Sequence, residues 1–270
     1  MILIFDTNGG LCNQFYDIIN GINFCLKNNI RFTFRYCTFR NDNLISWCQT
    51  PIEKLFDLAF LNKYDLYISY NDIIDKITND NCYNFNNKLL AYIVFKNVDI
   101  LDQLIKLNKD YVVLYQFWSL YNCTDFIDNT IHLHIRPSNT IMKKYIEIKA
   151  NIIRDEPYNF IHYRYEFDFT RYFKINVESL DTLINQIKFK NNKLKIFIAT
   201  SNIKSLINLS DCKYKNLIYK NDDMLDDFNF EQLAFIDYMF GLESVECYGH
   251  SKSSFSRMIN DIKQTENYYN

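Results

Sequence analysis

The sequence predicts an α/β protein built on a doubly wound, parallel sheet. Two observations carry this prediction. The chain opens as strand, glycine loop, helix and strand, and its second half alternates strands and helices with short connections. Both patterns are typical of βαβ units, in which helices cover a parallel sheet. With 270 residues, 48% of them hydrophobic, we expect two Rossmann-like domains, 1–135 and 136–270; a single larger α/β domain is the alternative.

The first βαβ unit is the clearest feature of the amino-terminal half. Residues 1–6 form an apolar strand, and the loop after it holds the Gly9–Gly10 pair. From Asn13 onward apolar residues recur at helical spacing, and 31–36 then favours a strand. Between 40 and 130 the pattern is less regular. There we expect a helix over 51–64, strands over 64–69 and 110–118, and a loop over 79–87.

The second half is more regular. A helix is expected from Pro137, which suits a first helical turn, to Arg154. KLKIFIAT, at 193–200, is the strongest strand pattern in the chain. The remaining expected elements are a strand within 156–169, a helix over 177–189, a strand over 216–220, a helix over 229–241, a strand over 244–248 and a helix from about 253.

Composition narrows the class of protein. The net charge is −2 and no basic stripe interleaves with aromatic residues, which argues against nucleic-acid binding. The eight cysteines form no CxxC pair, so we expect free thiols in a reducing compartment. The opening has no signal-peptide pattern, and the apolar run at 89–95 is too short to span a membrane. We therefore expect a cytoplasmic protein without an integral membrane segment.

His162 and Arg164 follow one another at the end of a predicted strand. Residues two apart point to the same face of a strand, and ligands of open α/β sheets bind at the carboxyl ends of strands. An arginine there can bind a phosphate through two parallel hydrogen bonds. The alternative is a surface arginine paired with Glu166 or Asp168.

The stretch FIDYMFGLESVECYGHSKSSFSRMI, at 235–259, predicts a helix, a strand, a tight turn and a second helix. We expect Gly249 to make the turn and His250 to cap it. Ser251, Ser253 and Ser254 are residue types that begin helices. Because a helix N-terminus carries unpaired N–H groups and partial positive charge, this turn is a candidate phosphate site.

No metal site or cofactor is expected. His132 and His134 have the spacing of a metal pair, but a third ligand is not evident and zinc needs three or four, so we interpret them as structural. The carboxylates of NDDMLDD, at 221–227, precede a helix, where acidic residues are favoured without a metal. The chain has no GxxxxGK[ST] sequence, which argues against P-loop chemistry.

Taken together, these pieces resemble the GDP-fucose protein O-fucosyltransferase family, within the inverting fucosyltransferases. GGLCNQ at 9–14, FIHYRYEFDF at 160–169 and IDYMFGLESVECYGHSKSSFS at 236–256 carry the resemblance. LHIRPS at 133–138 and IFIATS at 196–201 fall in the family's order. Cys12 stands where Gly or Asn is usual, and Ser201 where Asp is frequent. The family usually has a secretory leader or membrane anchor, which we do not expect in this protein.

The resemblance implies a GT-B fold, with GDP-fucose in the cleft between two domains and held mainly by residues 136–270. It implies that Arg164 contacts the β-phosphate beside His162, and that Asp237 reads or supports the guanine. It places the fucose and the acceptor at the amino-terminal loop. The donor-binding residues it implies are Gly10, Leu11, Cys12, Asn13, His162, Arg164, Asp237, Ser253, Ser254 and Phe255; of these, Arg164 and Asn13 are the catalytic candidates.

The expected activity is metal-independent, inverting transfer of fucose from GDP-fucose to a protein or glycan hydroxyl. Negative charge that grows on the leaving GDP would be met by Arg164 and the amides of 253–255. Two alternatives remain at this point: a similar transferase for another nucleotide sugar, and a non-catalytic module that binds GDP or a glycan. The sequence names neither the acceptor nor a general base.

Overall fold

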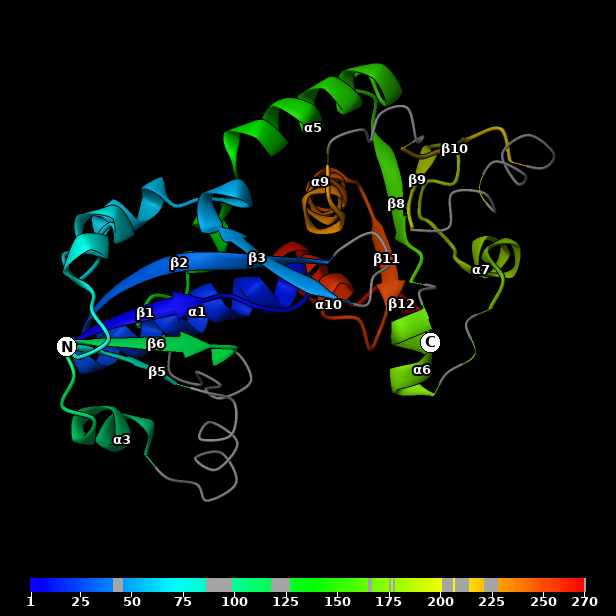
Figure 1. Ribbon diagram of the computed structural model, residues 1–270. Coiled ribbons are helices and arrows are strands. Elements are labelled where there is room, and N and C mark those ends of the chain that lie inside the picture. Colours follow the sequence, from blue (N-terminus) through cyan, green and yellow to red (C-terminus); the bar gives the residue numbers. More distant parts are fainter. Residues whose placement is uncertain are drawn as a thin grey trace. The chain divides into compact units, whose positions relative to one another are not determined.

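The computed structural model contains two five-stranded sheets, each in its own folding unit (Figure 1). Unit 1 comprises Met1–Thr140 together with Asn229–Glu231, and unit 2 comprises Ile141–Phe228 and Gln232–Asn270. The structure describes residues 1–40, 46–85, 99–117, 127–164, 167–174, 176, 178–200, 206, 214–220 and 228–269.

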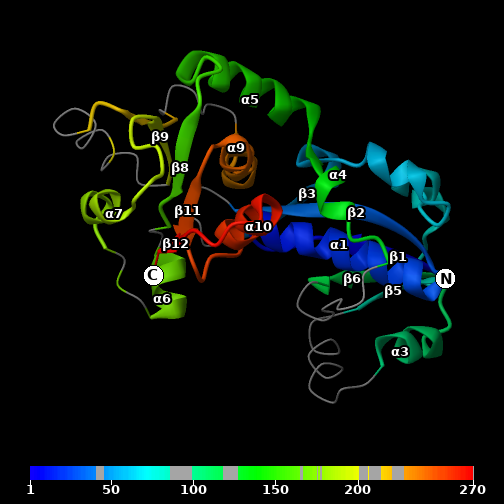
Figure 2. The ribbon, with the colours of Figure 1, turned by 180° about the vertical axis from the view of Figure 1, so that it is seen from behind.

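Unit 1 is organised around a sheet in the order β3-β2-β1-β6-β5. Its central strand β1 is parallel to β2 and β6, β5 is parallel to β6, and β3 is an antiparallel edge strand. The predicted βαβ opening is confirmed, because α1 connects β1 to β2 and lies along the sheet (Figure 2). The bounds are β1 Ile2–Asp6, α1 Leu11–Asn28, β2 Arg31–Arg40, β3 Trp47–Pro51, β5 Cys82–Asn84 and β6 Tyr111–Tyr115.

Short elements complete unit 1. Two two-residue strands, β4 and β7, pair antiparallel, with Phe56 opposite Pro137. In the described part of this unit, four 3₁₀ turns and two short helices connect the larger elements. They are η1 Ile52–Lys54, β4 Phe56–Asp57, η2 Ala59–Lys63, η3 Tyr70–Asp72, η4 Ile74–Lys76, α3 Ile100–Lys106, α4 Ile131–His134 and β7 Arg136–Pro137.

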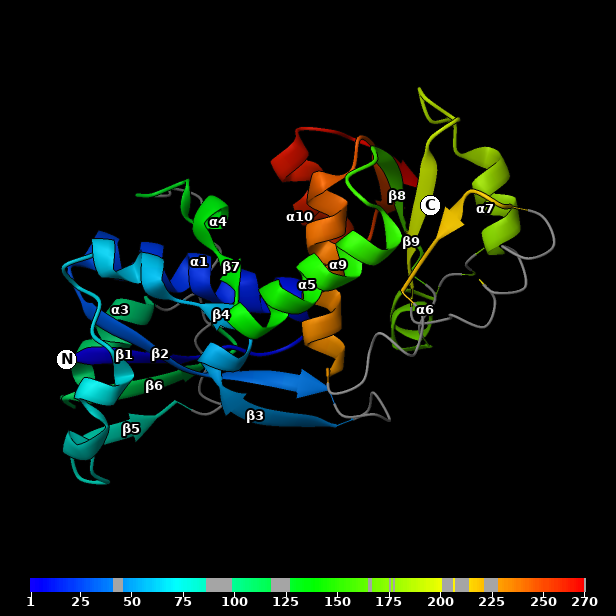
Figure 3. The same ribbon diagram turned by 90° about the horizontal axis from the view of Figure 1, so that it is seen from above.

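Unit 2 has a wholly parallel sheet in the order β10-β9-β8-β11-β12. Helices α7 and α9 lie on opposite faces of this sheet (Figures 1 and 3), as the alternating pattern predicted. The mixed α/β class is therefore confirmed. The bounds are α5 Asn139–Ile152, β8 Tyr158–His162, α6 Phe167–Phe173, α7 Leu180–Gln186, β9 Lys195–Ala199, β10 Leu217–Ile218, α9 Phe230–Glu243, β11 Cys247–His250, α10 Ser254–Lys263 and β12 Tyr268–Tyr269.

The strand β8 is buried at all five positions because helices cover both faces of the sheet. On one face Phe160 stacks on Phe197 with ring centroids 5.8 Å apart, and Phe197 stacks on Phe240 of α9 at 4.3 Å. On the other face Ile161 belongs to a buried cluster that includes Leu183 of α7. These two apolar layers fix the end of β8, where His162 lies.

Three predicted elements of unit 1 are wrong. Residues 51–64 form 3₁₀ turns and the strand β4 in place of one helix, because Phe56 pairs with Pro137. Within 64–69 only an isolated bridge forms, between Tyr67 and Phe32. The expected loop 79–87 contains β5, whose Cys82 pairs with Tyr111. In the first and third cases, a partner distant in the sequence overrides the local pattern.

In the second half of the chain, three boundaries differ from the prediction. Pro137 lies in β7, so the helix α5 begins only at Asn139. The strand expected within 156–169 ends at His162, and Phe167 already belongs to α6. The last strand is Cys247–His250, so Gly249 lies inside β11 and does not make the turn.

Candidate functional site

The carboxyl ends of β8 and β11 lie side by side in unit 2. The two strands are parallel, and His162 is the register partner of Gly249. Arg164 lies two residues beyond His162, the last residue of β8. Ser253, the N-cap of α10, lies four residues beyond Gly249. The structure therefore brings together the two predicted phosphate-binding segments at one edge of the parallel sheet, the edge formed by the carboxyl ends of its strands. Ligands of such sheets bind at this edge.

His162 is buried at the centre of this edge. Its Nδ1 is hydrogen-bonded to Ser256 Oγ at 2.8 Å, and its ring lies 4.3 Å from the ring of Phe255. Burial lowers the pKa of His162 well below its usual value, and the positive charge of Arg164 lowers it further. The imidazole is therefore neutral at pH 7 and serves as a hydrogen-bonding support, while Arg164 carries positive charge at this edge.

Gly249 allows α10 to approach the sheet closely. A Cβ at this position would lie 2.2 Å from Ser256 Oγ and 2.5 Å from Ser256 Cβ, so only glycine fits. This contact brings the first turn of α10 against His162. The sequence analysis predicted that Gly249 makes a turn, whereas Gly249 lies in β11 and allows α10 to pack closely.

The turn before α10 is closed by His250, as predicted. Lys252 N–H donates to His250 Nδ1 at 3.1 Å, and Ser253 N–H donates to the His250 carbonyl at 3.0 Å. The first intrahelical hydrogen bond of α10 runs from Arg257 N–H to Ser253 O. The amides of 254–256 therefore lie in the first turn, whose N–H groups have no partner within an α-helix. Ser254 and Phe255 therefore stand at an N-terminus suited to an anion.

Arg164 is partly exposed, and an aromatic pair of α6 supports it. Its guanidinium lies 5.3 Å over the ring of Phe169. Phe169 contacts Phe173 at 5.0 Å, and Lys252 Nζ lies 5.7 Å over Phe173. Two cations are thus held over adjoining rings by cation–π attraction. The sequence analysis missed Lys252, although its position between the capping serines was a signal. Glu166 and the side chain of Asp168, the alternative partners of Arg164, lie outside the described residues.

Asp237 lies on α9 in an ion pair. Its Oδ1 is 2.8 Å from Lys220 Nζ, which also donates to the Leu233 carbonyl at 3.1 Å. The next residue, Tyr238, contacts Phe255 with ring centroids 5.9 Å apart. Asp237 is thereby connected to the start of α10 through its neighbour, while its own carboxylate is neutralised by Lys220.

In unit 1 the glycine loop follows the carboxyl end of β1. Gln14, fully buried, ties this loop to β2: its amide donates to Gly9 O at 2.9 Å and to Thr38 O at 2.8 Å. Its oxygen accepts from Thr7 Oγ1 at 2.8 Å and Thr38 N–H at 3.2 Å. The sequence analysis gave Gln14 no role of its own. A polar residue four positions before Ile18, on the apolar stripe of the helix, was the available signal.

The predicted residues of this loop have different environments. The side chains of Leu11 and Cys12 are buried in the first turn of α1, so only their backbone can face a ligand. Asn13 is only half-buried, and its Nδ2 is 3.0 Å from where a Cβ on Gly9 would lie. Gly9 has φ +92°, a conformation that favours glycine. Asn13 is therefore the side chain of the first turn best placed to contact a ligand.

A buried ion pair adjoins the same loop. Arg40, the last residue of β2, donates from Nε to Glu231 Oε1 at 2.7 Å, and its backbone N–H donates to Glu231 Oε2 at 2.7 Å. The Arg40 guanidinium lies 3.8 Å from the position of a Cβ on Gly10. Sequence reasoning could not find this pair because its members are 191 residues apart.

The remaining candidates add no site. His134 stacks near Phe60 at 6.4 Å, consistent with a structural role. Within the ranges described, no group of three His, Cys, Asp or Glu could hold a metal ion; the carboxylates of 221–227 and Ser201 lie outside them. No helix of the described part is long and apolar enough to cross a membrane.

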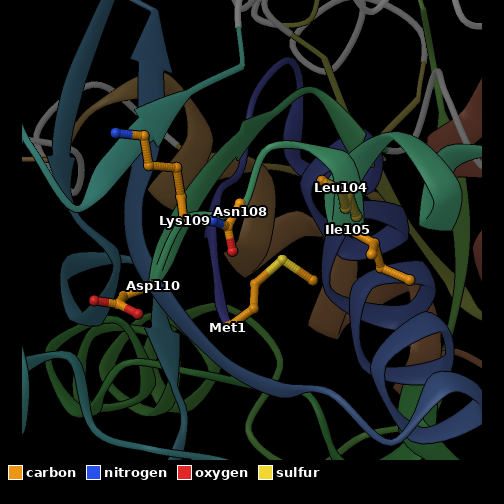
Figure 4. Close-up of a pocket in the computed structure, with 6 residues that line it drawn as sticks. All are labelled: Met1, Leu104, Ile105, Asn108, Lys109 and Asp110. Carbon is orange, nitrogen blue, oxygen red and sulfur yellow. The ribbon is translucent and has the colours of Figure 1, made fainter.

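A hollow of about 250 Å³ lies at the opposite, amino end of β1 (Figure 4). Met1, Leu104, Ile105, Asn108, Lys109 and Asp110 line it. Ligands of open α/β sheets bind at the carboxyl ends of the strands, so this hollow does not belong to the candidate site.

Comparison with known proteins gives a match in the fold alone. No family model and no curated protein sequence matches the chain. Among solved structures, POFUT1 in complex with GDP covers 99% of this chain and 98% of its own at TM-score 0.70 and 12% identity. POFUT1 with GDP-fucose gives TM-score 0.68 at 12% identity, over 99% and 97%. The fucosyltransferase NodZ from Bradyrhizobium gives 0.59 at 11% identity, over 96% and 91%. The predicted resemblance to fucosyltransferases is thus confirmed at the level of the fold.

Proposed function

We propose that this protein is a fucosyltransferase that takes fucose from GDP-fucose. The observation that carries the proposal is the juxtaposition of Arg164 and the N-terminus of α10 beside the neutral His162. A cation and a helix start at one sheet edge are suited to a diphosphate. The whole-chain likeness to the structures of POFUT1 with GDP and with GDP-fucose supports fucose as the sugar.

In this proposal catalysis works by charge stabilisation. When the bond between sugar and phosphate breaks, negative charge develops on the β-phosphate of GDP. The predicted donors include the Ser253 amide, but that N–H is already donated to the His250 carbonyl, so Arg164 and the amides of 254 and 255 remain. They are held in place before the reaction begins, and such preorganised donors stabilise developing charge most effectively. Removing one donor of this kind costs about 3–4 kcal/mol, or a hundred- to thousand-fold in rate.

The glycine loop of unit 1 supplies the second part of the proposal. Asn13 and the backbone of Gly10–Cys12 contact the fucose and a protein or glycan hydroxyl, which attacks from the face opposite GDP and inverts the anomeric carbon. Asp237 supports the guanine. The reaction proceeds without a metal, and the two domains, 1–135 and 136–270, have the GT-B arrangement. The rigid Gln14 network supports this assignment because it fixes the loop to β2.

The first test is donor choice. Calorimetric titration with GDP-fucose, GDP-mannose and UDP-sugars should give the tightest binding for GDP-fucose, and release of GDP in the presence of EDTA should follow. Preference for another donor would replace fucose in the proposal. Tight GDP binding with no release, over a panel of protein and glycan acceptors, would favour a non-catalytic module.

The second test is Arg164→Ala. We expect GDP release and transfer to fall at least a hundred-fold while the circular dichroism spectrum is unchanged. Arg136→Ala is the matched control, because Arg136 is exposed in β7 and far along the chain from this edge. Near-normal turnover of Arg164→Ala would refute the site, and product of unchanged anomeric configuration would refute inversion.

A further inference from the structure

The hydroxyl of Tyr269 bridges the chain at the point where it leaves β8. It donates a hydrogen bond to the His162 carbonyl at 2.7 Å and accepts one from Arg164 N–H at 3.1 Å. Tyr269 lies in β12, the edge strand beside β11, and its ring contacts His250 at 5.4 Å. One side chain therefore holds the backbone on both sides of residue 163.

Tyr163, the residue between His162 and Arg164, has hydrogen-bond partners of its own. Tyr163 N–H donates to the Ala199 carbonyl of β9 at 2.9 Å, and the Tyr163 hydroxyl donates to the Glu178 carbonyl at 2.9 Å. The ladder between β8 and β11 ends at the pair His162–Gly249. Beyond it, the Tyr269 hydroxyl takes the place of the next strand partner. The peptide between His162 and Tyr163 is held by Tyr269 and by Ala199, and the Arg164 N–H that follows donates to the same Tyr269 hydroxyl.

We propose that Tyr269 is a positioning residue that aims Arg164 at the β-phosphate of a nucleoside diphosphate; this inference rests on the proposed function. The hydroxyl acts through the backbone of 162–164 and does not touch the ligand. Loss of the bridge frees the Arg164 peptide to shift, and a displacement of about 1 Å can cost roughly a hundred-fold in a preorganised site. The effect is confined to ligands that Arg164 contacts.

The test compares GDP with GMP, which lacks the β-phosphate. Tyr269→Phe keeps the ring against His250 and removes the hydroxyl that forms the bridge. We expect it to weaken GDP binding and to slow GDP release from GDP-fucose, each by roughly ten-fold to a hundred-fold, and to leave GMP binding unchanged. Tyr268→Phe is the matched control: it is the neighbour on β12, its hydroxyl bonds Asn260, and it should change neither ligand.

A double-mutant cycle separates positioning from general damage. In an Arg164→Ala background, Tyr269→Phe should have no further effect on GDP, because both changes remove the same contact. Hydrogen exchange of the Arg164 amide should be faster in Tyr269→Phe, a readout that needs no ligand. Equal loss of GDP and GMP, additive effects, or unchanged GDP binding would overturn the inference. A wild-type protein that binds no GDP would instead refute the proposed function, and the inference would fall with it.

Discussion

Gly249→Ala is the sharpest test of how the sheet edge of unit 2 is built. The added Cβ would lie 2.5 Å from Ser256 Cβ and 2.2 Å from its Oγ. Rotating the serine side chain relieves only the second contact. Ordinary carbon–carbon contacts are about 3.5–4.0 Å, so the first turn of α10 must withdraw by about 1 Å. β11 cannot yield instead, because Gly249 is paired to β8 and to β12.

The expected cost follows from two parts. Overpacking a well-filled interior costs about 1–3 kcal/mol. Withdrawal of α10 also breaks the 2.8 Å bond between Ser256 and His162, which contributes about 1 kcal/mol. We therefore expect Gly249→Ala to lower the free energy of unfolding by about 2–4 kcal/mol. GDP binding should weaken as well, because the N-terminus of α10 moves away from Arg164.

Urea unfolding followed by circular dichroism measures the loss. Gly10→Ala is the control for the substitution itself: its φ of −61° suits alanine, the nearest atom belongs to Arg40 at 3.8 Å, and its cost should stay within about 1 kcal/mol. The double variant Gly249→Ala/Ser256→Gly removes the clash and should be more stable than Gly249→Ala alone. A Gly249→Ala protein as stable as the wild type, or a double variant without recovery, would refute the reasoning.

Three further predictions concern buried polar groups. Because the pKa of His162 is lowered in the folded protein, only the unfolded chain binds a proton at this residue as the pH falls below about 6.5. The free energy of unfolding should therefore drop by up to about 1.4 kcal/mol per pH unit, and less steeply in His162→Gln. Urea unfolding midpoints between about pH 7.5 and 5.5 check this. Burial raises the pKa of Cys247 to about 12 and that of Cys25 well above its usual value. Iodoacetamide at pH 8 should therefore modify the exposed Cys48 before Cys25 or Cys247, as mass spectrometry will show. Gln14→Leu leaves several buried loop and β2 groups unpaired and should destabilise by about 3 kcal/mol or more in urea unfolding; a loss below 1 kcal/mol would contradict the network.

The sequence predicted unit 2 well because its strands are apolar throughout and covered on both faces. β8 and β9 are such strands, and the helices between them carry clear periodicity. The order His162, Arg164 and the serines before α10 could also be found, because a parallel sheet places strand ends together. The role of Gly249 could not be predicted, because the space that its Cβ would need is occupied by Ser256, which lies on another element.

Unit 1 was harder to predict because its short elements depend on distant partners. β5 is three residues within the Asn-rich stretch 79–87, and they form a strand by pairing with β6. The segment 51–64 has helical spacing of apolar residues, yet Phe56 pairs with Pro137. The Tyr269 bridge and the Gln14 network likewise join residues through hydrogen bonds that no local pattern encodes.

The ion pair of Arg40 and Glu231 affects the stability of any fragment that contains unit 1 alone. Unit 1 is discontinuous in the chain, since Asn229–Glu231 belong to it. A fragment ending at residue 140 would keep the buried guanidinium of Arg40 but lack Glu231, which accepts the hydrogen bond from its Nε. Removing one partner of a buried ion pair costs about 3–5 kcal/mol. Limited proteolysis or gene dissection between the two sheets should therefore yield an unstable amino-terminal piece. Supplying the missing acidic peptide in trans, or replacing Arg40 with methionine, is the rational way to obtain a stable half.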